Sequence, residues 1–222
     1  MIRTDAASLE EKVYDELSES ILSAKFKKGD ALTETMLSKM LGTSRTPIRS
    51  ALHRLAEEGL VEIVPNRGAV VIGITEDDLV DIYHIRMRLE GLACALAAKK
   101  IREEEKKKLQ ENVELSEFYI NKKDTEHLKE LDTDFHRTIY HAAESPTLER
   151  ILTDLHRNTK AYRKLSLAVP GRLKKTAEEH KDILEAILAG DAAGAESLTA
   201  HHIEHALNNM LNILKNTENN TI

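Results

Sequence analysis

Four residues in the second half of the chain have the types and spacing of a metal site. Asp132 and His136 are four residues apart, so on a helix both side chains project from one face. His180 lies 10 residues before Gly190, and His202 lies 12 residues after it. In an antiparallel hairpin turning at Gly190, these separations are about 15 and about 18 Å, so both imidazoles return to nearly the same height. One carboxylate and three imidazoles suit a divalent ion such as Zn, Ni, Mn or Fe.

Spacing alone leaves other ligand assignments open. His201 and His205 compete with His202, and Asp134 competes with Asp132. A single histidine on a helix is commonly a surface residue or a satisfied polar group of the core.

A second group of residues could recognise an anion. Four residues fall on one helical stripe: Leu79, Tyr83, Arg86 and Glu90. Arg86 either pairs with Glu90 at i+4 or clamps the carboxylate of a small effector beside the metal. Further candidates for an effector pocket are Asn158, Tyr162 and Arg163. The helix that holds these three could equally form a subunit interface.

A helical bundle is needed to bring these side chains together. Residues 76–217 have a nearly unbroken helical pattern, interrupted by turn signals at Ser145-Pro146, Pro170-Gly171 and Gly190-Asp191. The expected helices span 77–100, 103–121, 124–143, 147–168, 172–189 and 192–215. We therefore expect one antiparallel all-helical bundle domain, followed by a frayed polar tail at 218–222.

Residues 1–75 have the pattern of a winged helix-turn-helix. An amphipathic helix is marked by Leu9, Val13, Leu17, Ile21 and Leu22. A second helix with the apolar stripe Leu37, Met40 and Leu41 ends at Gly42. Ser44 is a suitable N-cap for a third helix, whose core face carries Ile48, Leu52, Leu55 and Ala56. Two β-branched runs, 61–64 and 69–74, flank the turn 65–68 and predict a hairpin.

The third helix carries the chemistry of DNA recognition on its opposite face. The side chains there are Arg45, Thr46, Arg49, His53 and Arg54. Residues 35–56 contain four Lys or Arg and no Asp or Glu, although the whole chain has a net charge of -6. Such a patch can neutralise phosphates, and arginine can bind guanine bidentately. Arg67 at the hairpin tip suits contact with the DNA backbone or minor groove.

Composition limits the remaining possibilities. The 222 residues suffice for two domains, and 32% charged residues with 4% aromatic residues favour a mainly α protein. The one cysteine, Cys94, lies in an apolar run, so we expect a buried thiol and no disulfide. No basic-then-apolar leader and no spanning run of about 20 apolar residues is present. We therefore expect a cytoplasmic protein.

The run TSRTPIRSALHRLAEEGLVEIVPNRGAVV resembles the DNA-binding domain of GntR-type bacterial transcription regulators. The resemblance implies that Arg45 and Arg49, with the hydroxyls of Ser44 and Thr46, contact the operator. It also puts Gly68 at the tip of the wing. Some relatives have an arginine where this chain has Thr35, which leaves the operator sequence open.

The helical region resembles the FCD effector domain of the FadR-type branch of that family. The resemblance rests on the D-x-x-F-H stretch from Asp132 to His136, on Glu179-His180 and on His202. It implies that Asp132 and the three histidines hold a metal. It further implies that Arg86 faces a pocket for an organic acid.

These patterns lead us to expect a homodimeric transcription regulator that binds an inverted-repeat operator in double-stranded DNA and acts as a repressor. A small carboxylate bound beside the metal would control its affinity for DNA. One alternative is a metal sensor, in which the ion itself is the signal. A helical metal-dependent hydrolase is disfavoured, because the chain has no HExxH motif, phosphate loop or nucleotide fingerprint.

Overall fold

The computed structural model describes residues 3–22, 25–65, 67–73 and 76–219. The chain divides into two compact units. One is built mainly from the segment up to Glu76, and the other from 77–157 and 163–215.

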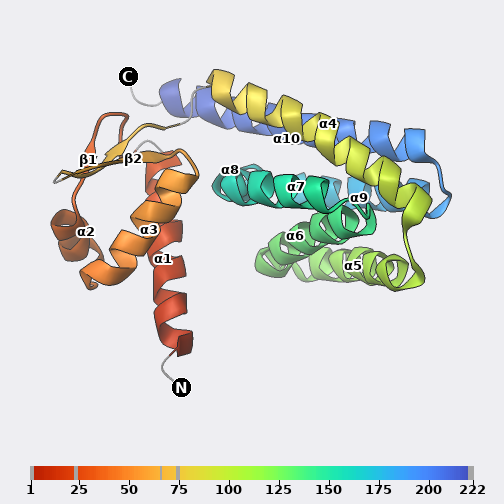
Figure 1. Ribbon diagram of the computed structural model, residues 1–222, viewed down its shortest axis with the longest axis horizontal. Helices are drawn as coiled ribbons and strands as arrows, with labels where there is room; N and C mark the ends of the chain where they lie inside the picture. The colour runs from red at the N-terminus through yellow and green to blue at the C-terminus, as the bar shows by residue number, and fades with distance from the viewer. Residues whose placement is uncertain (1–2, 23–24, 66, 74–75, 220–222) are drawn as a thin grey trace. The chain divides into compact units, whose positions relative to one another are not determined.

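Within the described residues, the N-terminal unit combines three helices with a three-stranded antiparallel sheet (Figure 1). Its helices are α1 (Arg3–Leu22), α2 (Glu34–Leu41) and α3 (Arg45–Glu57). Its strands are β1 (Ala31–Leu32), β2 (Val61–Val64) and β3 (Gly68–Val71), in the order β1-β3-β2. This arrangement is a winged helix-turn-helix, as the sequence predicted.

The turn between α2 and α3 has the expected chemistry with one difference. Gly42 closes α2 with a φ of 62°, and its N–H bonds to the Ser38 carbonyl. Ser44 has the extended backbone of an N-cap, but its side chain makes no capping hydrogen bond. Ser44 is exposed at the start of α3.

Two residues of the predicted apolar stripes are exposed: Leu9 at 41% and Met40 at 42%. The short helix α2 buries only Leu37, and among the described side chains of α1, which start at Leu9, the first buried one is Val13. Ile48, Leu52 and Leu55 are buried as predicted.

Strand β1 was not predicted, because two residues carry no periodic signal. Its Leu32 pairs with Ala69 of β3. Gly68 has a φ of 90°, and a Cβ there would lie 2.6 Å from the Leu32 carbonyl oxygen. Only glycine fits this position without moving the backbone.

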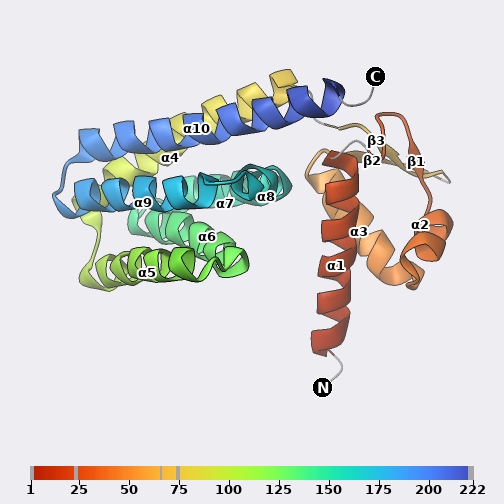
Figure 2. The ribbon, with the colours of Figure 1, turned by 180° about the vertical axis from the view of Figure 1, so that it is seen from behind.

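The helical unit is layered (Figures 1 and 2). Its helices are α4 (Glu76–Lys100), α5 (Glu103–Lys122), α6 (Thr125–Ala142), α7 (Pro146–Asn158), α8 (Lys160–Ala168), α9 (Arg172–Leu188) and α10 (Ala192–Asn219). The helices α4 and α10 lie side by side, and a Cβ on Gly91 of α4 would lie 3.1 Å from Glu196 Cγ of α10. Between this pair and the pair α5–α6 lie α7, α8 and α9.

The single helix expected at 147–168 is interrupted at Thr159 and forms α7 and α8 instead. Asn158 and Thr159 both have low helix propensity, because asparagine competes for backbone hydrogen bonds and threonine is β-branched. The last helix extends to Asn219, so residues 218 and 219, expected in the frayed tail, are helical. Residues 220–222 lie outside the described part of the chain.

An apolar core around Phe135, Ile139, Ile183 and Ile187 joins helices α4, α5, α6, α7, α9 and α10. Cys94 belongs to it, is 2% exposed and is a free thiol, as expected. Burial raises its pKa to about 12.

Candidate functional site

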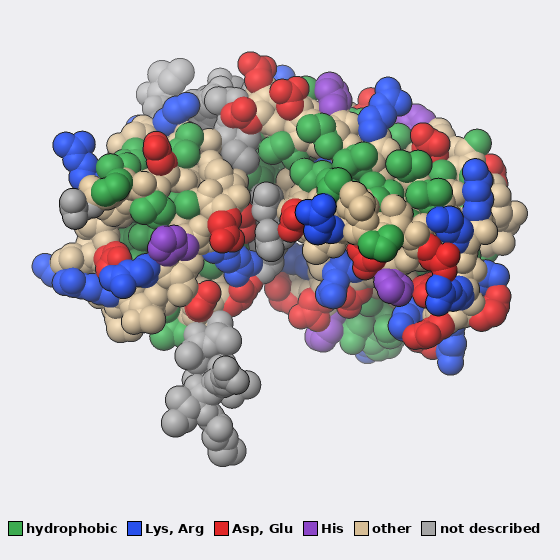
Figure 3. Space-filling view, in the orientation of Figure 1, with side chains coloured by type: hydrophobic (Ala, Val, Ile, Leu, Met, Phe, Trp, Pro, Cys, Tyr) green, Lys and Arg blue, Asp and Glu red, His purple; other side chains and the backbone are tan. Residues whose placement is uncertain are grey.

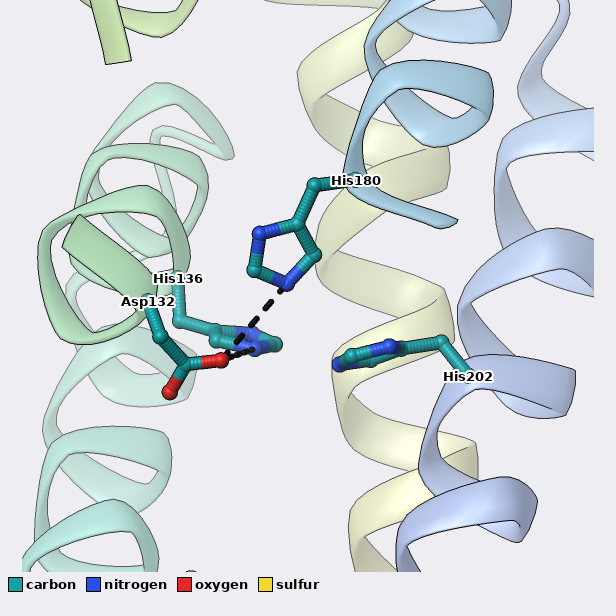
Figure 4. A group of neighbouring side chains, drawn as sticks. All are labelled: Asp132, His136, His180 and His202. Atoms are coloured by element: carbon teal, nitrogen blue, oxygen red, sulfur yellow. Dashed lines mark ion pairs between the residues drawn. The ribbon is translucent and has the colours of Figure 1, made fainter. Parts of the chain in front are cut away.

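Asp132, His136, His180 and His202 converge in the centre of the helical unit. Each offers one ligand atom, and these atoms all lie within 4.8 Å of one another. Asp132 Oδ1 is 3.7 Å from Nε2 of His180 and 4.0 Å from Nε2 of His136. Figure 4 shows the three imidazoles and the carboxylate pointing toward one point from α6, α9 and α10. None of the four is more than 5% exposed, so the group is sealed from solvent.

The alternative ligand candidates differ from the four converging residues in burial. His201 and Asp134 are exposed. His205 is partly buried, and its Nδ1 lies 2.7 Å from the Glu179 carboxylate. Among the described residues, the four predicted ones are the only group with metal-ligand geometry.

Two carboxylates orient the imidazoles from outside this group. Nδ1 of His136 is 3.0 Å from Oε2 of Glu90, and Nδ1 of His202 is 2.7 Å from Oε2 of Glu179. A carboxylate on Nδ1 holds the proton there and leaves Nε2 bare, which is a common arrangement around metal-binding histidines.

His180 is oriented by packing instead. Its ring stacks on Phe135 with 4.0 Å between centroids, and its buried Nε2 has no hydrogen-bond partner among the described residues. An orphaned buried nitrogen facing a carboxylate is the feature expected where an ion completes the site.

The protonation states suit a metal. Burial opposes ionisation of Asp132, but Arg163 and the nearby imidazoles outweigh it and lower its pKa. Burial lowers the pKa of His180 and of His202. Burial also opposes ionisation of Glu179, whose hydrogen bonds with His202 and Arg172 nevertheless bring its pKa to about 2. Ionised carboxylates and neutral imidazoles are the forms that bind metal. The donor set therefore fits a borderline divalent ion.

Both arginines expected at an effector pocket belong to the same buried network. Arg86 Nε lies 2.7 Å from Oε1 of Glu90, so the expected i+4 pairing occurs. Arg86 Nη1 nevertheless remains without a hydrogen-bond partner in the described part of the chain. Arg163 donates to Oδ2 of Asp132. Tyr162 is buried on α8, while the side chain of Asn158 lies outside the described residues.

Sequence reasoning missed several members of this network, including His156, which contacts Arg163, and Arg172, which pairs with Glu179. It did not assign Glu90 and Glu179 to the histidines, and it did not consider Tyr140, whose hydroxyl donates to Glu90 Oε2 at 2.9 Å. The position of Tyr140, four residues after His136, was a signal that could have placed it on the same helix face.

The exposed face of α3 carries the residues expected to read DNA. Arg45, Thr46, Arg49 and His53 are exposed, and Arg67 is exposed in the turn after β2. In Figure 3, Lys and Arg side chains lie along the left edge of the N-terminal unit. This surface is open to a polyanion.

Two arginines of α3 have acidic partners within the unit. Arg49 remains 63% exposed but makes a two-pronged ion pair with Glu34, through Nε at 2.7 Å and Nη2 at 2.9 Å. Arg54 is only 23% exposed, lies 2.7 Å from Glu11 Oε2 and stacks over the Tyr14 ring. Arg54 thus supports the packing of α3 on α1.

Comparison with known families explains why these two sites occur in one chain. The model of the bacterial regulatory proteins of the gntR family matches residues 9–71. The FCD domain model matches residues 81–205 and so covers all four residues of the candidate metal group. The chain belongs to the GntR family and carries an FCD domain. It is therefore a DNA-binding transcription regulator, and this family consists of regulators, not enzymes.

Several relatives of this GntR regulator are named repressors. It is 32% identical over 204 residues to the probable D-xylose utilization operon transcriptional repressor of Paenarthrobacter nicotinovorans, with 91% of this chain and 88% of the relative covered. It is 31% identical over 179 residues to the gluconate operon transcriptional repressor of Bacillus subtilis, with 81% and 72% covered. The solved structure of E. coli McbR/YncC matches with a TM-score of 0.66 and 26% identity, covering 94% and 98% of the two chains.

The predicted domain ranges 1–75 and 76–217 enclose the two matched segments. No helix in the described part of this GntR regulator is long and apolar enough to cross a membrane.

Proposed function

We propose that this GntR regulator is a cytoplasmic homodimeric repressor whose operator affinity is controlled by a small carboxylate bound beside a divalent metal. The observation that carries this proposal is the sealed group of Asp132, His136, His180 and His202, with ligand atoms within 4.8 Å. A structural polar core would satisfy its members among themselves, yet His180 Nε2 has no partner among the described residues.

The residues around this group supply the chemistry for an acid. A divalent ion held by the four ligands would offer an electrophilic partner for a carboxylate oxygen. Arg86 and Arg163 are buried within the same network and are the side chains that bind carboxylates best. Glu90 and Glu179 keep the imidazoles in the ligating orientation.

Recognition of DNA would use Arg45, Thr46 and Arg49 of α3, with Ser44 before it and Arg67 and Gly68 at the wing. One copy presents a small basic surface in an acidic chain, so useful affinity requires two copies on an inverted repeat. A groove between α4 and α10, lined by Ile85, Leu89 and Ala200 among others, is a suitable surface for pairing. Figure 3 shows hydrophobic side chains gathered over this part of the helical unit.

Repression is supported by relatives that are named repressors of the D-xylose and gluconate operons. An acid can change DNA affinity only if it favours one of two arrangements of the dimer over the other. In this proposal the acid favours the arrangement that binds the operator less well.

The test is an operator titration of the full-length protein in four conditions: metal-free, metal-loaded, with acid alone, and with both. A screen of carboxylic acids by thermal shift of the metal-loaded protein chooses the acid. The proposal expects a large loss of operator affinity only when metal and acid are both present. A loss caused by metal alone would instead identify a metal sensor, and no change in any condition would refute control through this site.

A further inference from the structure

The buried charges around the metal ligands cancel in pairs. Arg86 pairs with Glu90 at 2.7 Å, Arg163 pairs with Asp132, and Arg172 pairs with Glu179 at 2.9 Å. Each carboxylate beside the ligand group thus has one arginine of its own. The group is electrically balanced before any ion binds.

A divalent ion would upset this balance. Neutral imidazoles add no charge, and Asp132 is already matched by Arg163. The ion would therefore leave two positive charges uncompensated among residues that are at most 5% exposed. Uncompensated charge is costly in such surroundings, so a bound ligand is favoured most if it carries two negative charges.

A second group that could bind an anion is connected to the metal-ligand candidates through the Glu90 carboxylate. Glu90 contacts Arg86 through Oε1 and His136 through Oε2. On the same face of α4, Arg86 Nη1 and the Tyr83 hydroxyl are both buried without a hydrogen-bond partner among the described residues. The Arg86 guanidinium carbon is 4.7 Å from the centre of the Tyr83 ring. Both groups are donors that match an acceptor anion.

Resting on the proposed function, we propose that the effector is a small dicarboxylate. One carboxylate would complete the ligand group of Asp132 and the three histidines. The other would accept hydrogen bonds from Arg86 Nη1 and the Tyr83 hydroxyl. A neutral sugar would leave both positive charges uncompensated, and a monocarboxylate would leave one of them.

The test compares matched ligand pairs by isothermal titration to full-length protein loaded with one zinc ion per chain. Each pair consists of a diacid and its half-amide, which have nearly the same shape but differ by one charge: malonate and malonamate, succinate and succinamate, glutarate and glutaramate. At least one diacid should bind about tenfold or more tightly than its half-amide, because each good charge-assisted hydrogen bond contributes more than a neutral one. Equal or tighter binding of every half-amide would overturn the dicarboxylate assignment while leaving an acid effector intact. If no diacid and no half-amide bound, the inference and the acid part of the proposed function would both fall.

A variant tests the second anchor. Tyr83→Phe removes only the unpartnered hydroxyl, whereas removing Arg86 would strand the Glu90 carboxylate and endanger the fold. Tyr83→Phe should weaken the preferred diacid about tenfold and its half-amide less, with zinc content unchanged. The matched control is Tyr119→Phe on α5, whose ring stacks on His127. Unchanged diacid affinity in Tyr83→Phe would refute the anchor on α4.

Discussion

The Glu90 carboxylate lies 3.0 Å from Nδ1 of His136 and is at the same time the ion-pair partner of Arg86. One buried side chain of α4 therefore connects a metal-ligand candidate on α6 to the arginine expected to hold an acid. This contact makes α4 part of the site although α4 contributes no ligand to it.

Glu90→Gln keeps the size of the side chain but removes the charge that orients His136. We expect the affinity for zinc to fall by about 10- to 100-fold, as for other outer partners of metal ligands. Competition with a chromophoric chelator measures it. Glu114→Gln on α5 is the control, since Glu114 is exposed. Equal zinc affinity in both variants would remove Glu90 from the site.

Arg49→Ala removes an exposed side chain of α3 that can donate two hydrogen bonds at once. Specific operator binding should weaken by about 1–3 kcal/mol, the usual worth of a bidentate base contact. Footprinting and fluorescence anisotropy measure the change, and sedimentation checks that the oligomeric state of the variant matches that of the parent protein. Lys12→Ala, which also removes one exposed positive charge, should have a smaller effect. An unchanged footprint for Arg49→Ala would disprove the recognition role of this face.

Glu34→Gln tests the partner of Arg49. In the absence of DNA, Glu34 neutralises this arginine through two contacts at 2.7 and 2.9 Å. Removing the carboxylate leaves an additional net positive charge on the surface that we propose contacts DNA. Affinity for non-specific DNA should rise. The dependence of this affinity on salt concentration should steepen by up to about the amount expected for one additional phosphate contact. Glu57→Gln, at the exposed end of α3, is the control. A non-specific affinity that rises no more in Glu34→Gln than in this control would contradict the idea.

Gly68→Ala tests the junction of the wing with β1. The new Cβ would meet the Leu32 carbonyl oxygen at 2.6 Å, in addition to the strain of a φ of 90°. Gly29 has nearly the same φ, 91°, but open space around it, so Gly29→Ala isolates the strain. Chemical unfolding should show a loss of about 1–3 kcal/mol from the backbone strain in both variants and a further loss in Gly68→Ala alone. Equal losses would mean that the β1 contact is unimportant.

Local patterns predicted most of the helices and the wing hairpin and selected the four candidate ligands, because these features depend on short-range periodicity and on turn signals. The i+4 spacing of Asp132 and His136 and the turn at Gly190 were enough to select candidates for the metal group. Spacing could not choose between His201 and His202, since that choice depends on the rotation of α10 about its axis. Packing of α10 in the unit buries His202 and exposes its neighbour.

Contacts between helices that are distant in the sequence could not be predicted from sequence patterns. Glu90 contacts His136 only because α4 and α6 belong to the same bundle. From the sequence, the i+4 pairing with Arg86 already gave Glu90 a role, so no contact with a distant histidine was expected. Similarly, Glu34 lies one residue before the basic stretch 35–56. The positive charge of that stretch therefore seemed to have no acidic partner, although Arg49 forms an ion pair with Glu34. The break at Thr159 escaped notice because weak helix propensity is often overridden by packing.

The most direct test of the account is the response of two neighbouring histidine variants, His202→Ala and His201→Ala, to metal and acid. His202 is 4% exposed and belongs to the ligand group, while His201 is exposed on the same turn of α10. Zinc content and the acid-induced loss of operator affinity should both persist in His201→Ala and both disappear in His202→Ala. Retention of one zinc ion per chain and of the full acid response in His202→Ala would contradict the account.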